Sequence, residues 1–204
     1  PKVIKFCKIL EEGLNNKFGK NNYAFVSIGQ SPAVLAEILK THGIETAICP
    51  VSNLRVIDDI ETIFKNPEIG EYFKYLEEIG LDPNKIKNSN KQYVFTDYTC
   101  TWKSLKNFEK ILKRGGYDSS NMKFVSLQNI PTEYYKPKEG DGDFLDSFIY
   151  KYLCKGRLKI NYSPSFRIPA DNLHKIQKYK DETPINEKFN MLKFLILNEE
   201  STKV

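Results

Sequence analysis

Hydrophobic residues in the first two thirds of the chain occur in two kinds of run. Tyr23–Ile28 and residues 93–96 are short, rich in β-branched and aromatic side chains and free of breakers, which predicts two buried strands. Residues 45–49 and 123–127 have the same character and predict two more. Strands of this kind, separated by longer segments, are typical of βαβ units.

Between these strands, apolar residues recur at helical spacing. The expected helices are an N-terminal one ending near Gly13, then 33–42, two short ones within 57–64 and 72–79, and one from 105 to 113. Ser31 is placed to cap the second helix and Pro32 to occupy its first turn. The pair Gly115-Gly116 is expected to end the last one.

The alternation over residues 23–127 predicts an α/β fold with a mainly parallel central sheet flanked by helices. Residues 144–153 and a segment beginning near residue 184 predict two further helices without intervening strands. We therefore expect a single domain over residues 1–204. Residues 1–130 would form a phosphate-binding core, and residues 131–204 a C-terminal helical cap or hood packed on it.

Polar segments follow three of the predicted strands, at residues 27–31, 50–55 and 97–104. Carboxyl ends of parallel strands share one edge of a sheet, where ligands of α/β proteins bind. Free amides, hydroxyls and a helix N-terminus favour an anion, usually a phosphate. Taken alone, the third segment has a simpler explanation, in which Thr101 only caps the following helix.

Charge and composition exclude several classes. The chain of 204 residues has a net charge of +5, from 31 basic and 26 acidic residues that form no long block, so nucleic acid is not expected as a partner. No apolar run approaches the roughly 20 residues of a membrane helix. Four isolated cysteines and two histidines do not predict a zinc site, and reduced cysteines fit a cytoplasmic location.

The stretch over residues 93–105 resembles the signature of the phosphoribosyltransferase family. That signature is a hydrophobic strand, two acidic residues, and a threonine-rich phosphate loop that opens a helix. Asp97 falls on the second acidic position, Thr101 on the second loop threonine and Ser104 on the final hydroxyl. Residues 27–32 fall where the family places its pyrophosphate-binding loop. The resemblance covers about residues 20–130.

The resemblance implies binding of phosphoribosyl pyrophosphate or a nucleotide 5-phosphate with Mg²⁺, and transfer of phosphoribose to a nitrogen acceptor. Asp97 would be the catalytic residue, holding the ribose and, through water, the metal. The residues assigned to the 5-phosphate are Thr99, Cys100, Thr101, Trp102, Lys103 and Ser104. Those assigned to pyrophosphate are Gly29, Gln30, Ser31 and Arg55.

Two positions depart from the family pattern. Thr96 replaces the first acid, which leaves Asp97 as the one carboxylate for the ribose hydroxyls. Trp102 stands where the family has glycine, a residue that tolerates unusual backbone angles and lets the phosphate approach. An indole there would either crowd the loop or stack on a ligand.

Three other readings remain open. The first is a non-catalytic nucleotide or phosphosugar sensor or regulatory protein; under any reading the protein could form an oligomer. The second is a cysteine phosphatase, since Cys49 and Arg55 have the Cys-x5-Arg spacing that surrounds a phosphate with a thiolate and an arginine. The third is a nucleophile elbow at Ser31 with His174 as base.

Overall fold

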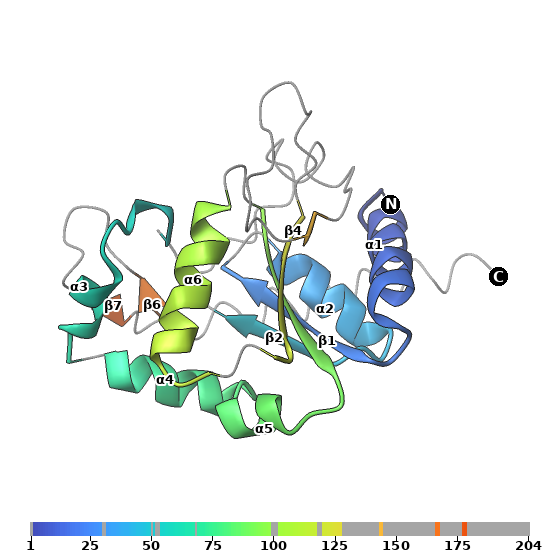
Figure 1. Cartoon of the computed structure of the whole chain (residues 1–204). Coiled ribbons are helices and arrows are strands. Elements are labelled where there is room, and N and C mark those ends of the chain that lie inside the picture. The colour runs from blue at the N-terminus through green and yellow to red at the C-terminus, as the bar shows by residue number, and fades with distance from the viewer. Residues whose placement is uncertain are drawn as a thin grey trace.

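The computed structural model describes residues 2–29, 32–49, 51, 54–67, 69–98, 102–117, 120–127, 143–144, 166–167 and 177–178. In chain order these form α1 (Lys2–Phe18), β1 (Tyr23–Ile28), α2 (Ala33–Thr41), β2 (Thr46–Cys49), the 3-10 turn η1 (Leu54–Val56), α3 (Ile60–Phe64), α4 (Ile69–Glu78), α5 (Pro83–Lys87), β3 (Gln92–Asp97), α6 (Lys103–Arg114), β4 (Met122–Ser126), β5 (Asp143–Phe144), β6 (Phe166–Arg167) and β7 (Gln177–Lys178) (Figure 1). The expected cap lies outside the described residues, apart from these last three short strands.

The central sheet has the strand order β2-β1-β3-β4-β5, and every neighbouring pair in it is parallel. This confirms the predicted α/β fold with a parallel sheet flanked by helices. β1 and β3 lie at its centre, although β2 separates them in the sequence. The chain therefore builds the sheet outward in two directions, which is the doubly wound arrangement. A separate antiparallel pair, β6 and β7, has two residues in each strand.

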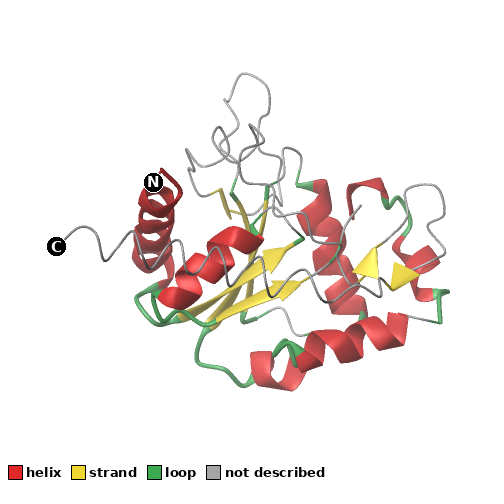
Figure 2. Ribbon diagram, turned by 180° about the vertical axis from the view of Figure 1, so that it is seen from behind, coloured by secondary structure: helices red, strands yellow, loops and turns green. Residues whose placement is uncertain are grey.

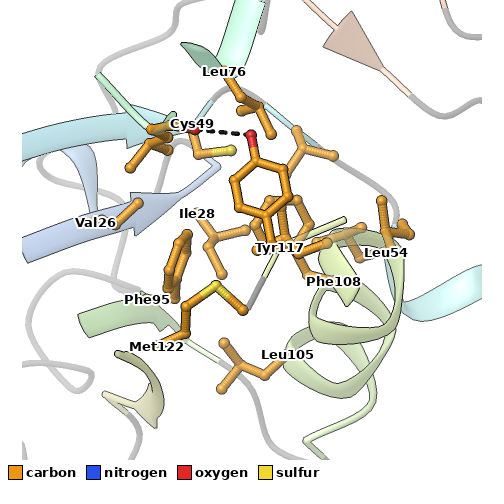
Figure 3. Close-up of a cluster of buried hydrophobic side chains, with 14 of the residues drawn as sticks. Val26, Ile28, Cys49, Leu54, Leu76, Phe95, Leu105, Phe108, Tyr117 and Met122 are labelled. Carbon is orange, nitrogen blue, oxygen red and sulfur yellow. Dashed lines mark hydrogen bonds between the residues drawn. The ribbon is translucent and has the colours of Figure 1, made fainter. Parts of the chain in front are cut away.

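Helices cover both faces of the sheet (Figure 2). Successive side chains of a strand point to opposite faces, and here both sets are apolar and must be buried. On β1, Ala24, Val26 and Ile28 belong to one buried cluster, whereas Tyr23 and Phe25 belong to another. The first cluster packs under η1, α3, α4, α5 and α6, and the second packs under α1 and α2. Figure 3 shows part of the first cluster, with Leu54 of η1, Leu76 of α4 and Phe108 of α6. The core therefore consists of two apolar layers separated by the sheet.

Four local predictions were wrong. α1 continues through Gly13 to Phe18, because Leu14 is fully buried and extends the apolar face beyond the glycine. Pro32 occupies the N-cap position of α2 rather than its first turn. Residues 83–87, for which no helix was predicted, form α5 with the Asp82 side chain accepting from the Lys85 amide. Phe144, expected to open a helix, lies in β5.

The end of α6 shows how tightly its glycine pair is used. Gly116 has φ +90°, a left-handed conformation that suits glycine. Gly115 has an ordinary φ of −80°, but a Cβ there would lie 2.2 Å from Cζ of Phe73. The Phe73 ring packs against Phe64 and Tyr117, so it has little room to retreat. Gly115 is therefore required by packing and Gly116 by backbone conformation.

We predict that Gly115→Ala lowers the free energy of unfolding by about 1–3 kcal/mol, the usual effect of overpacking. The matched control is Gly70→Ala on α4, where an added Cβ meets no atom within 4 Å. That change should be neutral or stabilising by up to about 1 kcal/mol, because alanine is the better helix former. Urea denaturation measures both. Equal effects of the two substitutions would contradict the packing explanation.

Candidate functional site

The candidate site lies at the edge of the sheet where its strands end, here named the carboxyl edge. β1 and β3 are paired in parallel with Ser27 opposite Thr96, so their last residues, Ile28 and Asp97, end side by side and Gly29 follows directly after. From this central pair the chain turns toward β2 on one side and toward β4 on the other. Ligands of doubly wound proteins bind at such a switch point. The parallel pairing confirms that the three strands before the polar segments end at one edge, whereas large parts of the segments themselves lie outside the described residues.

Asp97 is the last residue of β3 and is half-buried. Its Oδ1 accepts a hydrogen bond of 2.7 Å from the Tyr98 amide, and its backbone carbonyl accepts one from Leu127. No basic side chain of the described residues lies within ion-pair distance of the carboxyl. Desolvation by burial raises the Asp97 pKa to about 7, and the Tyr98 amide only partly counteracts it.

A carboxyl with such a pKa is incompletely ionised at neutral pH. Any cation or hydrogen-bond donor that approaches Asp97 would favour its charged form and lower its pKa. A ligand that supplies such a group would therefore stabilise the ionised Asp97 carboxyl. Acids with strongly shifted pKa values are frequent at functional sites, although structural ion-pair networks also produce them.

Thr96, directly before Asp97, has a structural role. Its side chain is fully buried, and its hydroxyl donates a hydrogen bond of 3.1 Å to the carbonyl of Val26 on the neighbouring strand. Alternation along β3 places Thr96 on the opposite face from Asp97. A carboxylate at position 96 would lie in the apolar layer under α2, so this chain has a single acid at the end of β3.

α6 begins beside Asp97. The first helical bond runs from the Lys106 amide to the Trp102 carbonyl, so the amides of residues 103–105 have no partner within the helix. Ser104 lies in this first turn and is half-buried. The Lys103 ammonium contacts Oδ1 of Asp58 at 2.7 Å, which directs it toward the segment after η1. The helix end thus offers amides, a hydroxyl and one engaged cation.

Trp102 adopts the left-handed conformation, with φ 60° and ψ −8°. This is a backbone region that favours glycine, the residue found at this position in the family that the stretch resembles. Its indole is only 2 % exposed and belongs to the core cluster with Leu105 and Phe108. A side chain buried in this way is not available to stack on a ligand, which leaves the Trp102 backbone to serve the site.

Two further assigned residues lie at the same edge. Gly29 has φ +72°, and its amide donates to the Cys49 carbonyl at 2.8 Å; a Cβ there would lie 3.0 Å from the Val51 carbonyl oxygen. Arg55 is exposed on η1. The other assigned residues lie outside the described part of the chain, namely Gln30, Ser31, Thr99, Cys100 and Thr101. His174 lies outside it as well.

The environment of Cys49 is opposite to that of a nucleophilic cysteine. The side chain is fully buried, and its Sγ lies 3.2 Å from the Tyr72 hydroxyl. Burial raises the pKa of the thiol to about 12, and the hydrogen bond with Tyr72 only partly offsets this. Because the thiolate is the nucleophilic form, a thiol that stays protonated at neutral pH does not suit the cysteine phosphatase reading.

Sequence reasoning missed Asn107, which lies on α6 with 7 % exposure. Its side-chain nitrogen donates to the carbonyls of Leu54, at 2.7 Å, and Ile57, at 2.8 Å. The only local signal is an asparagine, a poor helix former, inside an otherwise amphipathic helix. Its partners are distant in the sequence and could not be identified from that signal.

Comparisons of the chain with protein-family models, with curated proteins and with solved structures find no match. None of the described helices has both the length and the apolar character needed to cross a bilayer. The described residues also contain no group of three or more His, Cys, Asp or Glu side chains placed to bind a metal. Function is therefore inferred from the residues and geometry of the carboxyl edge.

The raised pKa of Asp97 predicts a pH-dependent stability difference between the wild type and Asp97→Asn. Between pH 4 and 7 the folded wild type holds a proton that the unfolded chain has released, so its free energy of unfolding falls as pH rises. We expect the free energy of unfolding of the wild type, relative to that of the variant, to fall by at least about 1.4 kcal/mol over this pH range, which is the equivalent of one pKa unit. Urea denaturation at several pH values measures it; a flat difference would contradict the assignment.

Substitutions at Trp102 separate its buried indole from its left-handed backbone. Trp102→Ala should lower the free energy of unfolding by about 3–5 kcal/mol, because a large core side chain is removed. Trp102→Gly should be about 1 kcal/mol more stable than Trp102→Ala, since glycine adopts positive φ without strain. An ordinary helical position gives the reverse order. Glycine no better than alanine would show that the conformation is not required.

Proposed function

We propose that the carboxyl edge binds a phosphorylated ribose, as phosphoribosyl pyrophosphate or a nucleotide 5-phosphate, and transfers phosphoribose to a nitrogen acceptor. The observation that carries this proposal is the position of Asp97 at the switch point, shortly before the first turn of α6, whose amides have no partner within the helix. A carboxyl suits ribose hydroxyls and helix amides suit a phosphate. The two sets of groups lie in the same order along the chain as in the family signature.

In this proposal each group has a simple task. Asp97 Oδ2 accepts hydrogen bonds from the ribose hydroxyls, while its Oδ1 stays bonded to the Tyr98 amide. The first-turn amides of α6 and the Ser104 hydroxyl hold the 5-phosphate. Arg55 binds the pyrophosphate from the β2 side of the edge. Gly29 gives the ligand room because it carries no side chain, since its amide is already bonded to the Cys49 carbonyl. Catalysis would come from orientation and from stabilising the departing anion.

Mg²⁺ is expected from the family resemblance, and Asp97 is the residue that would have to support it. Among the described residues, Asp97 is the acid at the end of β3, so it would hold the ion through water, and the remaining ligands would be phosphate oxygens. That mode suits Mg²⁺, which keeps several waters and is often bound by one carboxylate together with substrate phosphates. When bound, the ion would supply charge neutralisation on the pyrophosphate.

A second candidate is a non-catalytic nucleotide or phosphosugar sensor. The observation in its favour is that Asp97 stands without a neighbouring acid and has a pKa of about 7. A partly protonated carboxyl binds hydroxyls and amides of a ligand but is a poorer support for a metal and a developing positive charge. In this reading the same edge recognises the ligand without turnover.

Both readings require that the protein binds a phosphorylated ligand, and ligand titration tests this. Phosphoribosyl pyrophosphate, ribose 5-phosphate and nucleoside monophosphates at millimolar concentration should stabilise the protein in thermal-shift measurements, by about 1.4 kcal/mol at ten times the Kd. Asp97→Asn should weaken the ribose-containing ligands. The matched control is Asp82→Asn on α5, where asparagine caps the helix as well as aspartate does. Absence of stabilisation by every ligand would refute the proposal.

Pyrophosphate release from phosphoribosyl pyrophosphate, measured with purine, pyrimidine and nicotinate-like acceptors, then separates an enzyme from a sensor. For a transferase we expect turnover that falls at least about tenfold in Asp97→Asn while inorganic phosphate binding is retained. Tight nucleotide binding without release in any acceptor supports the sensor.

A further inference from the structure

The segment after β2 reaches the carboxyl edge through η1, and this turn is weakly closed by its own backbone. Its internal hydrogen bond, from the Ile57 amide to the Leu54 carbonyl, is 3.4 Å long, beyond the usual range for such bonds. The side chains of Leu54 and Ile57 are nonetheless almost completely buried, at 4 % and 1 % exposure. Something outside the turn must hold these buried carbonyl groups.

Asn107 supplies those hydrogen bonds. Its amide donates to both carbonyls, at 2.7 and 2.8 Å, so one side chain of α6 bonds the first residue of η1 and the residue directly after the turn. Both bonds are shorter than the internal bond of the turn. A buried carbonyl left without a donor costs about 1–3 kcal/mol. The conformation of η1 therefore depends on a side chain that comes from another element.

The same turn carries Arg55, whose side chain is exposed. No hydrogen bond or ion pair joins it to another residue in the part of the chain that the structure describes. Asp58, directly after the turn, pairs with Lys103 in the first turn of α6 at 2.7 Å. Lys103 and Asn107 are one helical turn apart, so both ends of the segment are attached to one face of α6. The segment that carries Arg55 is thereby held beside the N-terminal half of that helix.

We propose that Asn107 is a positioning residue of the carboxyl edge: its amide holds η1 against α6 and so fixes the place of Arg55 relative to the first turn of that helix. This inference rests on the proposed function for the nature of the ligand, an anion with two phosphate groups. The local claim, that Asn107 determines the conformation around Arg55, does not need the ligand.

The amide is suited to this role because it is a donor of two hydrogens without charge. A carboxylate of the same shape would face two carbonyl oxygens with an acceptor and repel them. Asn107→Asp should therefore release η1 while leaving most of the α6 packing in place. Arg55 would remain in the protein but would no longer be held at the edge.

The test uses the full chain and inorganic pyrophosphate as the probe, with calorimetric titration of wild type, Asn107→Asp, Arg55→Ala and the double variant. We expect each single change to weaken binding about tenfold, and the double variant to bind no more weakly than Arg55→Ala. The control is Asn121→Asp, because Asn121 donates to the carbonyls of Ile86, Lys87 and Ser89 at the opposite edge of the sheet. That variant should lose stability but keep its affinity.

Limited trypsin digestion under native conditions gives a reading that is independent of any ligand. Cleavage after Arg55 should be at least tenfold faster in Asn107→Asp than in Asn121→Asp at matched global stability. Asn107→Ala, which removes the donor without adding repulsion, serves if the aspartate variant does not fold.

The outcomes separate the two proposals. If wild type binds neither pyrophosphate nor any phosphorylated ribose, the proposed function fails, and the digestion alone decides whether Asn107 holds the turn. If wild type binds and Asn107→Asp binds equally well, the positioning role is overturned and the function stands. Additive losses in the double variant, or equal cleavage in the two asparagine variants, also overturn the positioning role.

Discussion

The parallel pairing of β1 with β3 is the constraint on which the rest of this structure depends. The two strands are adjacent in the sheet although residues 29–91 separate them in the chain. Both are covered by helices on both faces, so their side chains are apolar almost throughout. Because the strands point the same way, the chain must leave both at the same edge. Polar residues that cannot enter the core therefore collect there.

The parallel arrangement that stabilises the centre of the sheet leaves polar groups at the carboxyl edge without a full set of partners among the described residues. Asp97 ends the strand without a described cation beside it, and the first turn of α6 leaves its amides free of helical bonds. Both features cost stability in the isolated protein, and both are features that a suitable ligand would satisfy. Such local costs are common at functional sites, where activity and stability favour different arrangements.

The sequence was sufficient for the elements whose pattern is local. The run Tyr23–Ile28 and the apolar spacing of α6 predicted a strand and a helix because their burial follows from periods of two and 3.6 residues. It failed where tertiary contacts override local preference. Gly13 did not end α1, because Leu14 directly after it is buried in the core, and Phe144 pairs with β4 as a strand instead of opening the expected helix.

The same division applies to the site. Asp97 could be placed at the carboxyl edge because strand direction follows from the alternation of elements. The burial of the Trp102 indole could not be predicted, since it depends on a cluster assembled from β1, β3 and α6. Asn107 was beyond reach for the same reason: its partner Leu54 is 53 positions away in the sequence. Side chains that position a site through distant backbone groups leave almost no local trace.

α6 connects the core to the proposed ligand edge through two of these residues. The left-handed backbone at Trp102 costs about 1–2 kcal/mol, whereas burial of a side chain of this size contributes about 3–5 kcal/mol, so the core outweighs the strain. One turn later, Asn107 attaches η1 to the same helix. The direction of the first-turn amides and the place of Arg55 are thus both consequences of how α6 packs. In this arrangement, a ligand that bridges the amides and Arg55 would bind groups already ordered by the fold, which lowers the entropy cost of binding.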